Sequence, residues 1–574
     1  MRRVRYICIA FSIFLLEFQG IPSFAGPWSP PPKVCGYKDI NSPGDDRVCW
    51  TISPQTNLTF GSFLTQQTKP PSANSRGEWS NCNGQPGVAP CNQKDGDYFA
   101  VITLPHCESI TQEWCIEGLT VSPQGPEKVV GQFLRNVEGY KTDAFPSLGF
   151  PAGTTPGLWK VRDVVHSGNT DTYVAIVNVQ FYASTLHDST LTHYEPRIAN
   201  LEARIIPYKQ ISRDTSATSP NECAWTEALN TICGEVHDFK SNFKASLTIR
   251  VSNKLTGWLM GRLADPVVTV APVSLSHNRL TIEARPIEVP LFFVSVDNSK
   301  LTDAMKKTFA SAGYKGYHLE KPFGLYQARE TYDYSPDVIT AFKDAANDRA
   351  VASSVVWSFE STNFGSGSDC LKSTDKLMGI VTTNSIAYEG TAPRFVDGFL
   401  DYKVAGVHFN PDGSVFEGRY DLVMLKSIAQ CLYGFSDAPI SATISILRDG
   451  AEQRISTSSL KEFGEGAFTW LKLSAQGFTF SNPTLRVKLS QASDSSSTPE
   501  KVTQVLETPE VKENAKTEPK PKPEKIEKAP KNQSSVEVKS SAKQLKKSII
   551  CVKGKITKKV TGSKPKCPTG FKKQ

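Results

Sequence analysis

The sequence predicts a mainly β, multi-domain protein with tandem β-sandwich (Ig-like) domains, a small α+β region, a disordered linker and a small C-terminal hairpin module. Three observations support this fold class. Short runs rich in Val, Ile, Thr and aromatic residues alternate apolar with polar positions between Gly, Pro, Asn and Ser. Patterns with helical periodicity are few. Twelve of the 13 cysteines fall into neighbouring pairs, which is typical of exported domains held by disulfides.

Residues 1–25 have the features of a secretory signal peptide. An arginine-rich start precedes an apolar run over residues 6–16, and small residues form a cleavage site that ends at Ala25. The apolar run has 11 residues and is too short to remain as a membrane-spanning helix. We therefore expect a secreted protein with no transmembrane segment after cleavage.

Cysteine spacing predicts disulfides between sequence neighbours. Cys8 lies inside the signal peptide, which leaves an even number of cysteines in the mature chain. No C-x-x-C occurs and no histidines repeat at ligand spacing beside the pairs, so we predict no metal site. If all of these cysteines pair, no thiol nucleophile remains. The predicted pairs are Cys35/Cys49, Cys82/Cys91, Cys107/Cys115, Cys223/Cys233, Cys370/Cys431 and Cys551/Cys567.

Two predicted regions follow the signal peptide. Residues 26–150 are rich in turns and hold three of the predicted disulfides, which would compensate for a thin apolar core. Residues 151–297 contain six strand-like runs with few helical patterns, so we expect a β-sandwich domain there. The six runs cover residues 158–165, 172–182, 201–208, 244–251, 267–273 and 280–296.

Residues 298–394 have a different pattern, that of an α+β region or an insertion. We expect an amphipathic helix over 301–312. Ser335, Pro336 and Asp337 predict the start of a second helix, in which Ser335 is the cap and the helix runs to about residue 348. A strand over 355–359 follows.

Residues 395–490 return to a strand pattern. The runs 404–409 and 415–425 flank Pro411-Asp412-Gly413, whose turn chemistry predicts a hairpin. Further strand-like runs complete an expected Ig-like β-sandwich. These runs cover residues 443–447, 468–473 and 484–489.

Residues 491–545 form a linker of Ser, Thr, Pro, Lys and Glu without aromatic residues, so we expect it to be disordered. Formal charge is unevenly distributed along the chain. The whole chain carries +8, the last 29 residues carry +10, and residues 26–490, which we call the body, carry −5. A nucleic-acid-binding body would carry a basic face of its own, so no specific nucleic-acid partner is predicted.

No catalytic site can be identified from the sequence. The motifs G-x-S-x-G, the P-loop and H-E-x-x-H are absent. The densest histidine group is His187, His193 and Glu195, whose spacing favours a polar loop between strands over a zinc site. We therefore predict no catalytic residue and no cofactor.

One segment has the composition of a ligand-binding site. Its candidate residues are Tyr326, Glu330, Tyr332, Asp333 and Tyr334. Aromatic faces beside carboxylates suit sugars, and paired acids suit glycoside hydrolysis if a cleft separates them correctly. The alternative is a polar loop whose tyrosines pack on the sandwich below.

Residues 546–574, which we call the C-terminal module, hold ten lysines, no acidic residue and the pair Cys551/Cys567. Runs over 550–553 and 556–560 predict a hairpin, after which residues 565–568 would return to Cys551. Lysine is a point charge suited to phosphate groups, so we expect the module to anchor the protein to anionic cell-envelope polymers. The alternatives are a solubilising surface or a sorting signal. The predicted anchor residues are Lys553, Lys555, Lys558, Lys559, Lys564 and Lys566.

The module also carries a resemblance. Its pattern I-x-C-V-K-G-K-x-x-K-x-V, followed by P-K-C-P-x-G-F-K-K, resembles a C-terminal module of secreted or surface proteins of high-GC Gram-positive bacteria. The segments D-G at 412–413, Y-D-L at 420–422, C-L-Y-G-F at 431–435 and G-F-T-F-S at 477–481 are similar to the domain that often accompanies it. The resemblance implies an exported, envelope-associated protein, and this family has no settled activity.

The sequence therefore predicts a secreted, envelope-associated binding or adhesion protein without an identifiable catalytic site. Its candidate partners are anionic envelope polymers, glycans and other surface proteins. The alternative is an extracellular glycan-acting hydrolase or a carbohydrate-binding protein. Two facing carboxylates across a cleft would favour the hydrolase.

Overall fold

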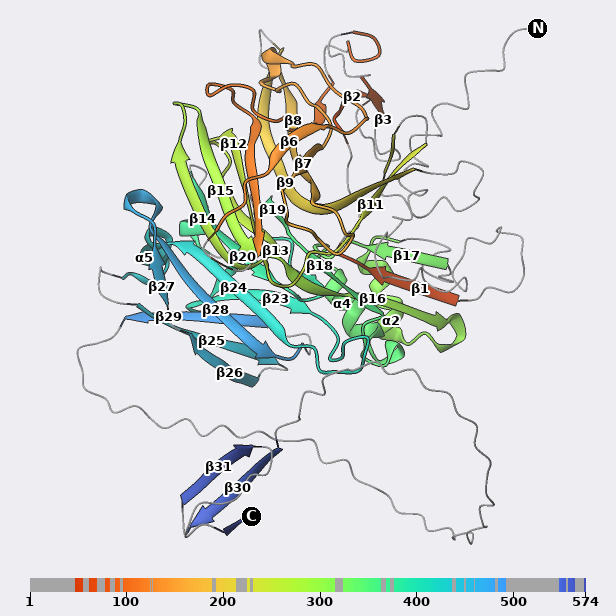
Figure 1. Cartoon of the computed structure of the whole chain (residues 1–574). Helices are drawn as coiled ribbons and strands as arrows, with labels where there is room; N and C mark the ends of the chain where they lie inside the picture. The colour runs from red at the N-terminus through yellow and green to blue at the C-terminus, as the bar shows by residue number, and fades with distance from the viewer. Residues whose placement is uncertain are drawn as a thin grey trace, which may run out of the picture. The chain divides into compact units, whose positions relative to one another are not determined.

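The computed structural model divides the chain into two compact units at residue 496 (Figure 1). The predicted signal peptide, Cys35, Cys223 and nearly all of the predicted linker lie outside the described residues. The structure describes residues 47–54, 61–69, 78–82, 88–92, 96–123, 125, 127–187, 192–212, 225–227, 231–314, 324–362, 368–371, 376–435, 440–448, 451–458, 460–480, 484–491, 547–553, 556–562 and 572–573.

The described part of the body is mainly β, which confirms the predicted class. Its three described α-helices are α2 (Asp303–Ser311), α4 (Ser335–Phe342) and α5 (Lys426–Tyr433). The finer prediction of tandem Ig-like sandwiches is not confirmed. None of the described helices has both the length and the apolar composition needed to cross a bilayer.

A 15-stranded sheet, which we call the long sheet, runs through the body. Its strand order is β27-β28-β24-β20-β13-β19-β9-β8-β4-β2-β3, and β6, β7, β10 and β11 pair beside this path. The strands are β2 (Phe63–Lys69), β3 (Glu78–Asn81), β4 (Tyr98–Thr103), β6 (Gln132–Asn136), β7 (Gly157–Lys160), β8 (Thr172–His187), β9 (Thr192–Ser212), β10 (Trp225–Glu227), β11 (Ile232–Val236), β13 (Gly257–Arg262), β19 (Ser358–Thr362), β20 (Leu377–Thr383), β24 (Gly418–Leu425), β27 (Lys461–Phe463) and β28 (Trp470–Phe478).

The long sheet takes strands from all four predicted regions of the body. β4, β9, β19 and β24 come from residues 26–150, 151–297, 298–394 and 395–490, respectively, and all belong to this one hydrogen-bonded sheet. Turn residues mark where strands end, but pairing between distant segments depends on contacts that a local pattern does not contain. The described body is therefore one unit across residues 150, 297 and 394.

Three smaller sheets pack around the long sheet. The first has the order β14-β15-β12-β5, from β14 (Ala264–Pro272), β15 (His277–Arg285), β12 (Phe243–Ser252) and β5 (Cys115–Pro123). In β15 the apolar residues Leu280, Ile282 and Ala284 alternate with more exposed positions, and they join the main core. This period-two pattern is that of a sheet with one buried face.

The second small sheet carries two helices. Its order is β17-β1-β16-β18, from β17 (Gly324–Ala328), β1 (Arg47–Ile52), β16 (Ile287–Asp297) and β18 (Ala352–Val356). Helices α2 and α4 pack on it around Trp50, in a core separate from the main one. The predicted start of α4 is confirmed, but Ser335 is not its side-chain cap: the Ser335 hydroxyl donates to the carbonyl oxygen of Arg329 at 2.6 Å.

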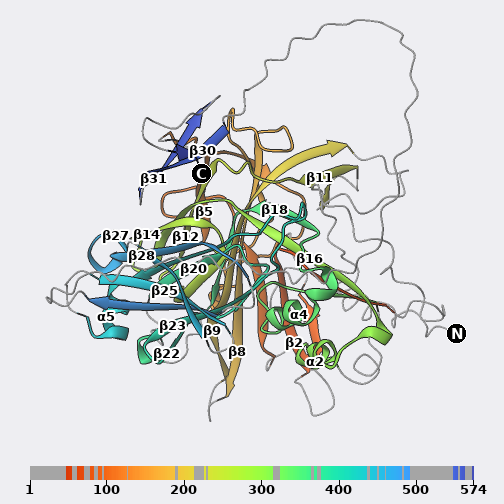
Figure 2. The ribbon, with the colours of Figure 1, turned by 90° about the horizontal axis from the view of Figure 1, so that it is seen from below.

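The third small sheet contains β21 (Ala387–Tyr388), β22 (Arg394–Val396), β23 (Phe399–Ala405), β29 (Thr484–Gln491), β25 (Ile440–Arg448) and β26 (Ala451–Ser458). It faces the end of the long sheet, where the rings of Tyr402 and Tyr420 lie 6.1 Å apart. Figures 1 and 2 both show this sheet and the helices α2 and α4 at opposite sides of the body.

The predicted hairpin around Pro411-Asp412-Gly413 is only half correct. The turn exists: Gly413 has a φ of 87°, and its N–H donates to the carbonyl oxygen of Asn410 at 2.9 Å. The strands beyond it diverge, because β23 pairs with β29 while β24 pairs with β20 and β28. Turn chemistry reverses the chain here without determining which sheet each arm joins.

The C-terminal module folds as a small sheet of its own. β30 (Lys547–Lys553) lies between β31 (Ile556–Gly562) and β32 (Lys572–Lys573) in a three-stranded sheet. The predicted hairpin is confirmed, since Cys551 pairs in register with Lys558. Residues 565–568, which were predicted to return to Cys551, lie outside the described residues; Lys573 pairs with Cys551 on its other side.

Three predicted disulfides are confirmed: Cys82–Cys91, Cys107–Cys115 and Cys370–Cys431. Cys49 and Cys233 are also disulfide-bonded. Their predicted partners, Cys35 and Cys223, lie outside the described residues, as does Cys567, the predicted partner of Cys551.

Candidate functional site

The predicted tyrosine-rich segment does not form one surface. Tyr326 lies in β17 and is only 5% exposed. Its ring packs 5.1 Å from the ring of Trp50 and 5.0 Å from that of Phe309. Tyr326 is therefore part of the core around Trp50.

Tyr332, Asp333 and Tyr334 occupy the turn between β17 and α4. Tyr332 is 40% exposed and Asp333 is exposed, whereas Tyr334 is half-buried. The rings of Tyr332 and Tyr334 lie 5.4 Å apart. Burial raises the pKa of the Tyr334 hydroxyl well above its usual value, so this group stays protonated. Tyr332 and Asp333 keep the character of a surface site, whereas Tyr334 packs against the core around Trp50.

Glu330 turns inward and joins a buried charge cluster, which consists of Glu202, Arg204, Arg329, Glu330 and Glu360. Glu202 and Arg204 lie on β9, and Glu360 lies on the neighbouring β19. Arg329 and Glu330 reach the cluster from the turn after β17, so the cluster lies between the long sheet and the sheet that carries α2 and α4. Arg204 is 8% exposed and Glu330 is 7% exposed.

Strand register brings two carboxylates together in this cluster. β9 and β19 are antiparallel, with Glu202 directly opposite Glu360. Opposed residues of such a pair have Cβ atoms about 5 Å apart on the same face, and two like charges there repel each other. The arginines offset this repulsion. Arg204 Nε donates to Glu202 Oε1 at 2.8 Å, and Arg329 Nη2 lies 3.8 Å from Glu202 Oε2.

The surroundings of Glu360 change its pKa strongly. Burial raises the pKa of Glu360 to about 7; the Arg329 charge acts against burial, and the Glu330 and Glu202 charges add to it. Burial lowers the pKa of Arg204, but the Glu202 and Glu330 charges outweigh burial and hold it above its usual value. Glu360 therefore changes its protonation state near neutral pH.

Next to Arg204 the described residues leave little of the open space that glycan hydrolysis would require. Beside Arg204 and Ser358 the described residues leave a cavity of about 20 Å³. A cavity of this size holds about one water molecule, so a sugar ring does not fit there. No group of three or more His, Cys, Asp or Glu side chains within the described ranges is arranged to hold a metal ion. The cluster is best described as a charged contact between two sheets that includes Glu360, a carboxyl with a raised pKa.

Glu202, Arg204 and Glu360 were not among the residues singled out from the sequence. The sequence does contain part of the pattern that marks these residues. Along β9, Glu202 and Arg204 alternate with the buried apolar residues Leu201, Ala203 and Ile205. Such alternation predicts that the strand has one apolar and one polar face, but it does not predict which element covers the polar face. The loop prediction for His187, His193 and Glu195 was wrong, because all three lie in the paired strands β8 and β9.

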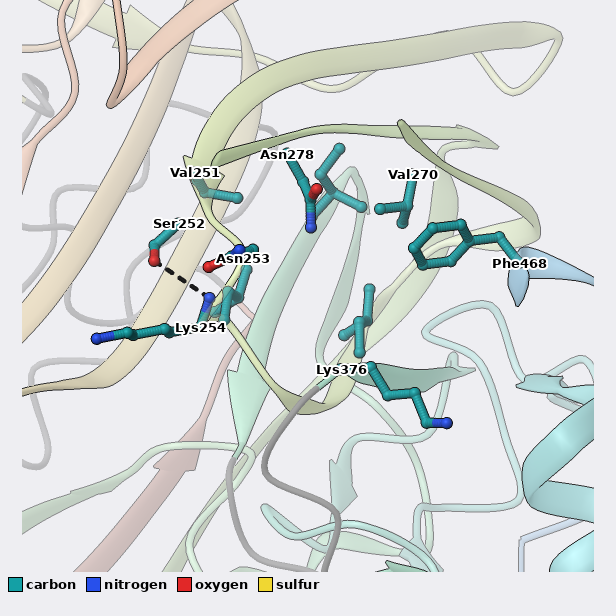
Figure 3. A pocket seen from close by; sticks show the side chains of 11 residues that line it. Val251, Ser252, Asn253, Lys254, Val270, Asn278, Lys376 and Phe468 are labelled. Atoms are coloured by element: carbon teal, nitrogen blue, oxygen red, sulfur yellow. Dashed lines mark hydrogen bonds between the residues drawn. The ribbon is translucent and has the colours of Figure 1, made fainter. Parts of the chain in front are cut away.

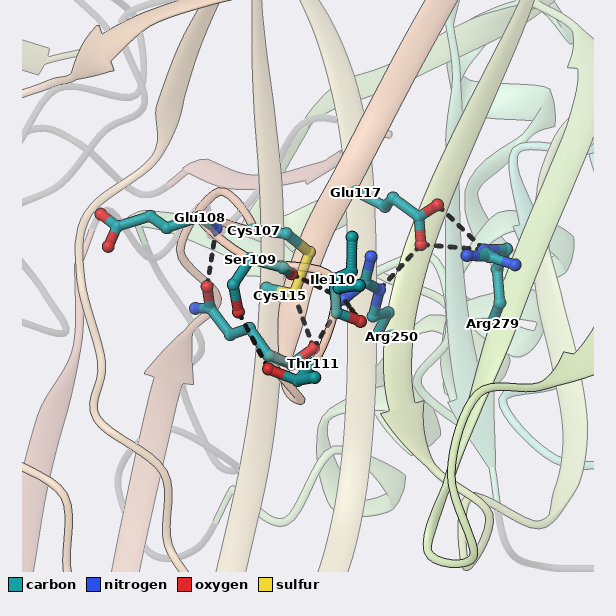
Figure 4. Close-up of a disulfide and its surroundings, with 10 residues drawn as sticks. Cys107, Glu108, Ser109, Ile110, Thr111, Cys115, Glu117, Arg250 and Arg279 are labelled. Carbon is teal, nitrogen blue, oxygen red and sulfur yellow. Dashed lines mark hydrogen bonds and ion pairs between the residues drawn. A yellow bond between two sulfur atoms is a disulfide. The ribbon is translucent and has the colours of Figure 1, made fainter.

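An exposed loop at residues 107–115 is held unusually firmly (Figure 4). Arg250 Nη1 donates to three of its backbone carbonyl oxygens, at 2.8–3.0 Å, while Arg250 Nε is paired with Glu117 at 2.8 Å. At the tip of this loop, Ile110 is 86% exposed. The disulfide and Arg250 together present an apolar side chain on a rigid support.

The predicted anchor lysines belong to the separate C-terminal unit. Lys553 ends β30, and Lys558 and Lys559 lie in β31, opposite Cys551 and Ile550. Lys555, Lys564 and Lys566 lie outside the described residues. Comparison with models of known protein families, with curated protein sequences and with solved structures gives no match.

Proposed function

We propose that this protein is a secreted binding or adhesion protein that is retained at the bacterial envelope through its C-terminal module. The observation that carries the proposal is the separation of charge between two units. The body carries −5, whereas the module carries ten lysines and no acid, and the two belong to different compact units. A basic unit on an acidic body directs attachment to anionic polymers through one end of the chain.

The disulfides support the exported location. Oxidised pairs persist outside the cytosol, and three are present together with the bonded Cys49 and Cys233. The resemblance of the module to those of high-GC Gram-positive surface proteins has the same implication. The facing sheets at Tyr402 and Tyr420 support an Ig-like sandwich over residues 395–490 as part of this proposal.

Binding by the body is supported by its rigid exposed loop. A loop that is already ordered loses little conformational entropy when it meets a partner. The loop 107–115, with Ile110 at its tip, is fixed by a disulfide and by Arg250. Because the loop exposes the apolar side chain of Ile110, we infer that its partner is another surface protein.

Glycan binding is the second candidate function, and the exposed Tyr332 beside Asp333 favours it. Aromatic rings stack on sugars, and carboxylates bind their hydroxyl groups. A glycan array probed with the body and with Tyr332→Ala separates the two functions. Glycan binding predicts a signal that the substitution removes, and an array without signal contradicts it.

Fractionation of the producing cells tests the main proposal. The full chain should sediment with the envelope, and a chain that lacks residues 546–574 should appear in the medium. Replacement of the six predicted anchor lysines by glutamine should give the same release, since it removes charge and retains length. Envelope retention of both variants would show that the body, or a covalent link, holds the protein.

A further inference from the structure

A pocket of about 220 Å³ opens at the edge of the main core (Figure 3). Five segments meet there. They are residues 251–255 at the end of β12 and the turn after it, the paired strands β14 and β15, the start of β20, and the short helical turn at 466–468. The turn after β12 is fixed locally, because the N–H of Leu255 donates to the carbonyl oxygen of Ser252 at 3.0 Å.

The floor of this pocket is apolar. Leu255, Leu280 and Leu377 are buried at its base, and the partly buried Val270 and Phe468 form a wall. An apolar cavity of about 150 Å³ is enough to hold a benzene molecule. The pocket thus has room for one aromatic ring with a short chain attached, which is less than a drug-sized ligand requires.

The polar groups of the pocket are Ser252, Asn253, two lysines and Asn278, whose side chain Figure 3 shows pointing into the pocket. The Asn253 side chain is already used, since its Nδ2 donates to the carbonyl oxygen of Leu275 at 2.9 Å. The Ser252 hydroxyl accepts from the N–H of Lys254 at 3.1 Å, as the dashed line in Figure 3 shows. These bonds hold the mouth in shape.

Two lysines flank the mouth from opposite sides. Lys254 is exposed and Lys376 is half-buried, and neither forms an ion pair with any residue that the structure describes. Figure 3 shows both lysine side chains extending from the rim of the pocket in opposite directions, with their ammonium groups turned away from it. Lysine stems are flexible, so either ammonium group can turn towards a charge at the mouth. On a body of net charge −5, two cations that form no ion pair within the described part of the chain, beside an apolar pocket, favour an anionic ligand.

We propose that this pocket binds a small carboxylate with an aromatic body. The ring lies on Leu280, Leu377 and Phe468, and the carboxylate lies at the mouth between Lys254 and Lys376. This ligand site goes beyond the envelope attachment proposed above and does not require the C-terminal module.

Calorimetric titration of the mature chain with 3-phenylpropionate tests the site. The uncharged 3-phenylpropanol and the cationic 3-phenylpropylamine share its ring and chain, and they serve as matched ligands. We expect the carboxylate to bind at least about tenfold more tightly than the alcohol, the change expected when a charge-assisted contact is lost. Equal affinity of the three ligands, or no binding of the carboxylate at millimolar concentration, overturns the proposal.

Variants locate the site. Lys254→Gln with Lys376→Gln should weaken carboxylate binding by about tenfold and leave alcohol binding unchanged. Val270→Trp should fill the cavity and abolish both. The control Lys461→Gln with Lys488→Gln removes two lysines that do not line the pocket, and it should bind like the parent chain. Full carboxylate affinity in the Lys254/Lys376 variant, with unchanged melting temperature, would contradict the site.

Discussion

At the scale of single residues, burial decides which sequence-predicted side chains keep a functional surface. Tyr326 and Tyr332 have the same chemistry and lie six positions apart in the sequence. One packs on Trp50 and the other faces solvent, because Tyr326 belongs to β17 and Tyr332 to the turn that follows. The composition of residues 326–334 identifies the segment as a candidate site. It does not predict which tyrosine is buried, because burial depends on the pairing of β17 with β1, which is far away in the sequence.

Glu360→Gln should stabilise the body at pH 8. The folded-state pKa of Glu360 is about 7, above its usual 4.5, so its protonated form is favoured by folding. Stability from this group is present below pH 4.5 and is lost as the pH rises through 7. Each pKa unit corresponds to about 1.4 kcal/mol, so the substitution should add about 1–3 kcal/mol at pH 8 and little at pH 4.5. Chemical denaturation at the two pH values measures this difference.

Glu202→Gln is the matched control, with the opposite expected sign. It removes the partner of the buried Arg204, and an uncompensated buried charge costs about 3 kcal/mol or more. Equal destabilisation by both substitutions at pH 8 would show that Glu360 is a charged, paired carboxylate instead of a destabilising one.

Asp265 forms an ionic contact between the sheet of β14 and β15 and the long sheet, and a substitution of Asp265 can test this contact. It lies in β14 and pairs with Arg285 of β15 at 2.6 Å and with Arg419 of β24 at 2.6 Å. Burial raises its pKa, but the hydrogen bond from Arg285 and the charges of Arg419 and Lys472 outweigh burial and lower it to about 2. Its contribution is therefore present above pH 3.8 and is lost as the pH falls through 2.

Asp265→Asn should destabilise the body by about 1 kcal/mol at pH 7, a value discounted because the side chain is 41% exposed. The control is Asp163→Asn: both residues have positive φ, 56° and 64°, and asparagine tolerates that conformation. Thermal melts at pH 7 compare the two. A loss for Asp163→Asn as large as that for Asp265→Asn would assign the effect to the backbone and not to the ion pairs.

At the scale of elements, the sequence predicted which segments form strands, but it did not predict which strands pair with each other. The runs at 172–182 and 201–208 lie in β8 and β9, and the alternation along them is that of a sheet with two different faces. Asn410 to Ser414 form the expected turn, yet its arms enter different sheets. The helix α5 was missed because it is short and directly continues the strand β24.

The disulfide that fixes α5 should contribute more stability than a short-range one. Cys370–Cys431 spans 61 residues and Cys82–Cys91 spans 9. Chain entropy gives about 4 kcal/mol for the longer loop and about 3 kcal/mol for the shorter. Paired serine replacements at each bridge, compared by denaturant midpoint, measure the contributions. A smaller loss for Cys370→Ser with Cys431→Ser would indicate that native packing already holds α5 in place.

At the scale of the whole molecule, the chain separates an acidic β body from a basic C-terminal module. The composition already indicated this separation, and the structure adds that the module has a three-stranded sheet of its own. The long sheet takes strands from all four predicted regions of the body and so crosses the predicted boundaries at residues 150, 297 and 394. No local sequence pattern contains this long-range pairing. Attachment through lysines implies contacts that weaken as salt shortens the screening length from about 10 Å at 0.1 M to about 3 Å at 1 M.

The salt dependence of binding to a phosphate polymer is the most direct measurement of this account. Affinity of the mature chain for long-chain polyphosphate should fall steeply and linearly on logarithmic axes as sodium chloride rises, since bound lysines release counterions. Glutamine at the six anchor positions should flatten the slope, and deletion of residues 546–574 should abolish binding. Binding that is independent of salt, or that survives the deletion, would contradict an electrostatic anchor in the C-terminal module.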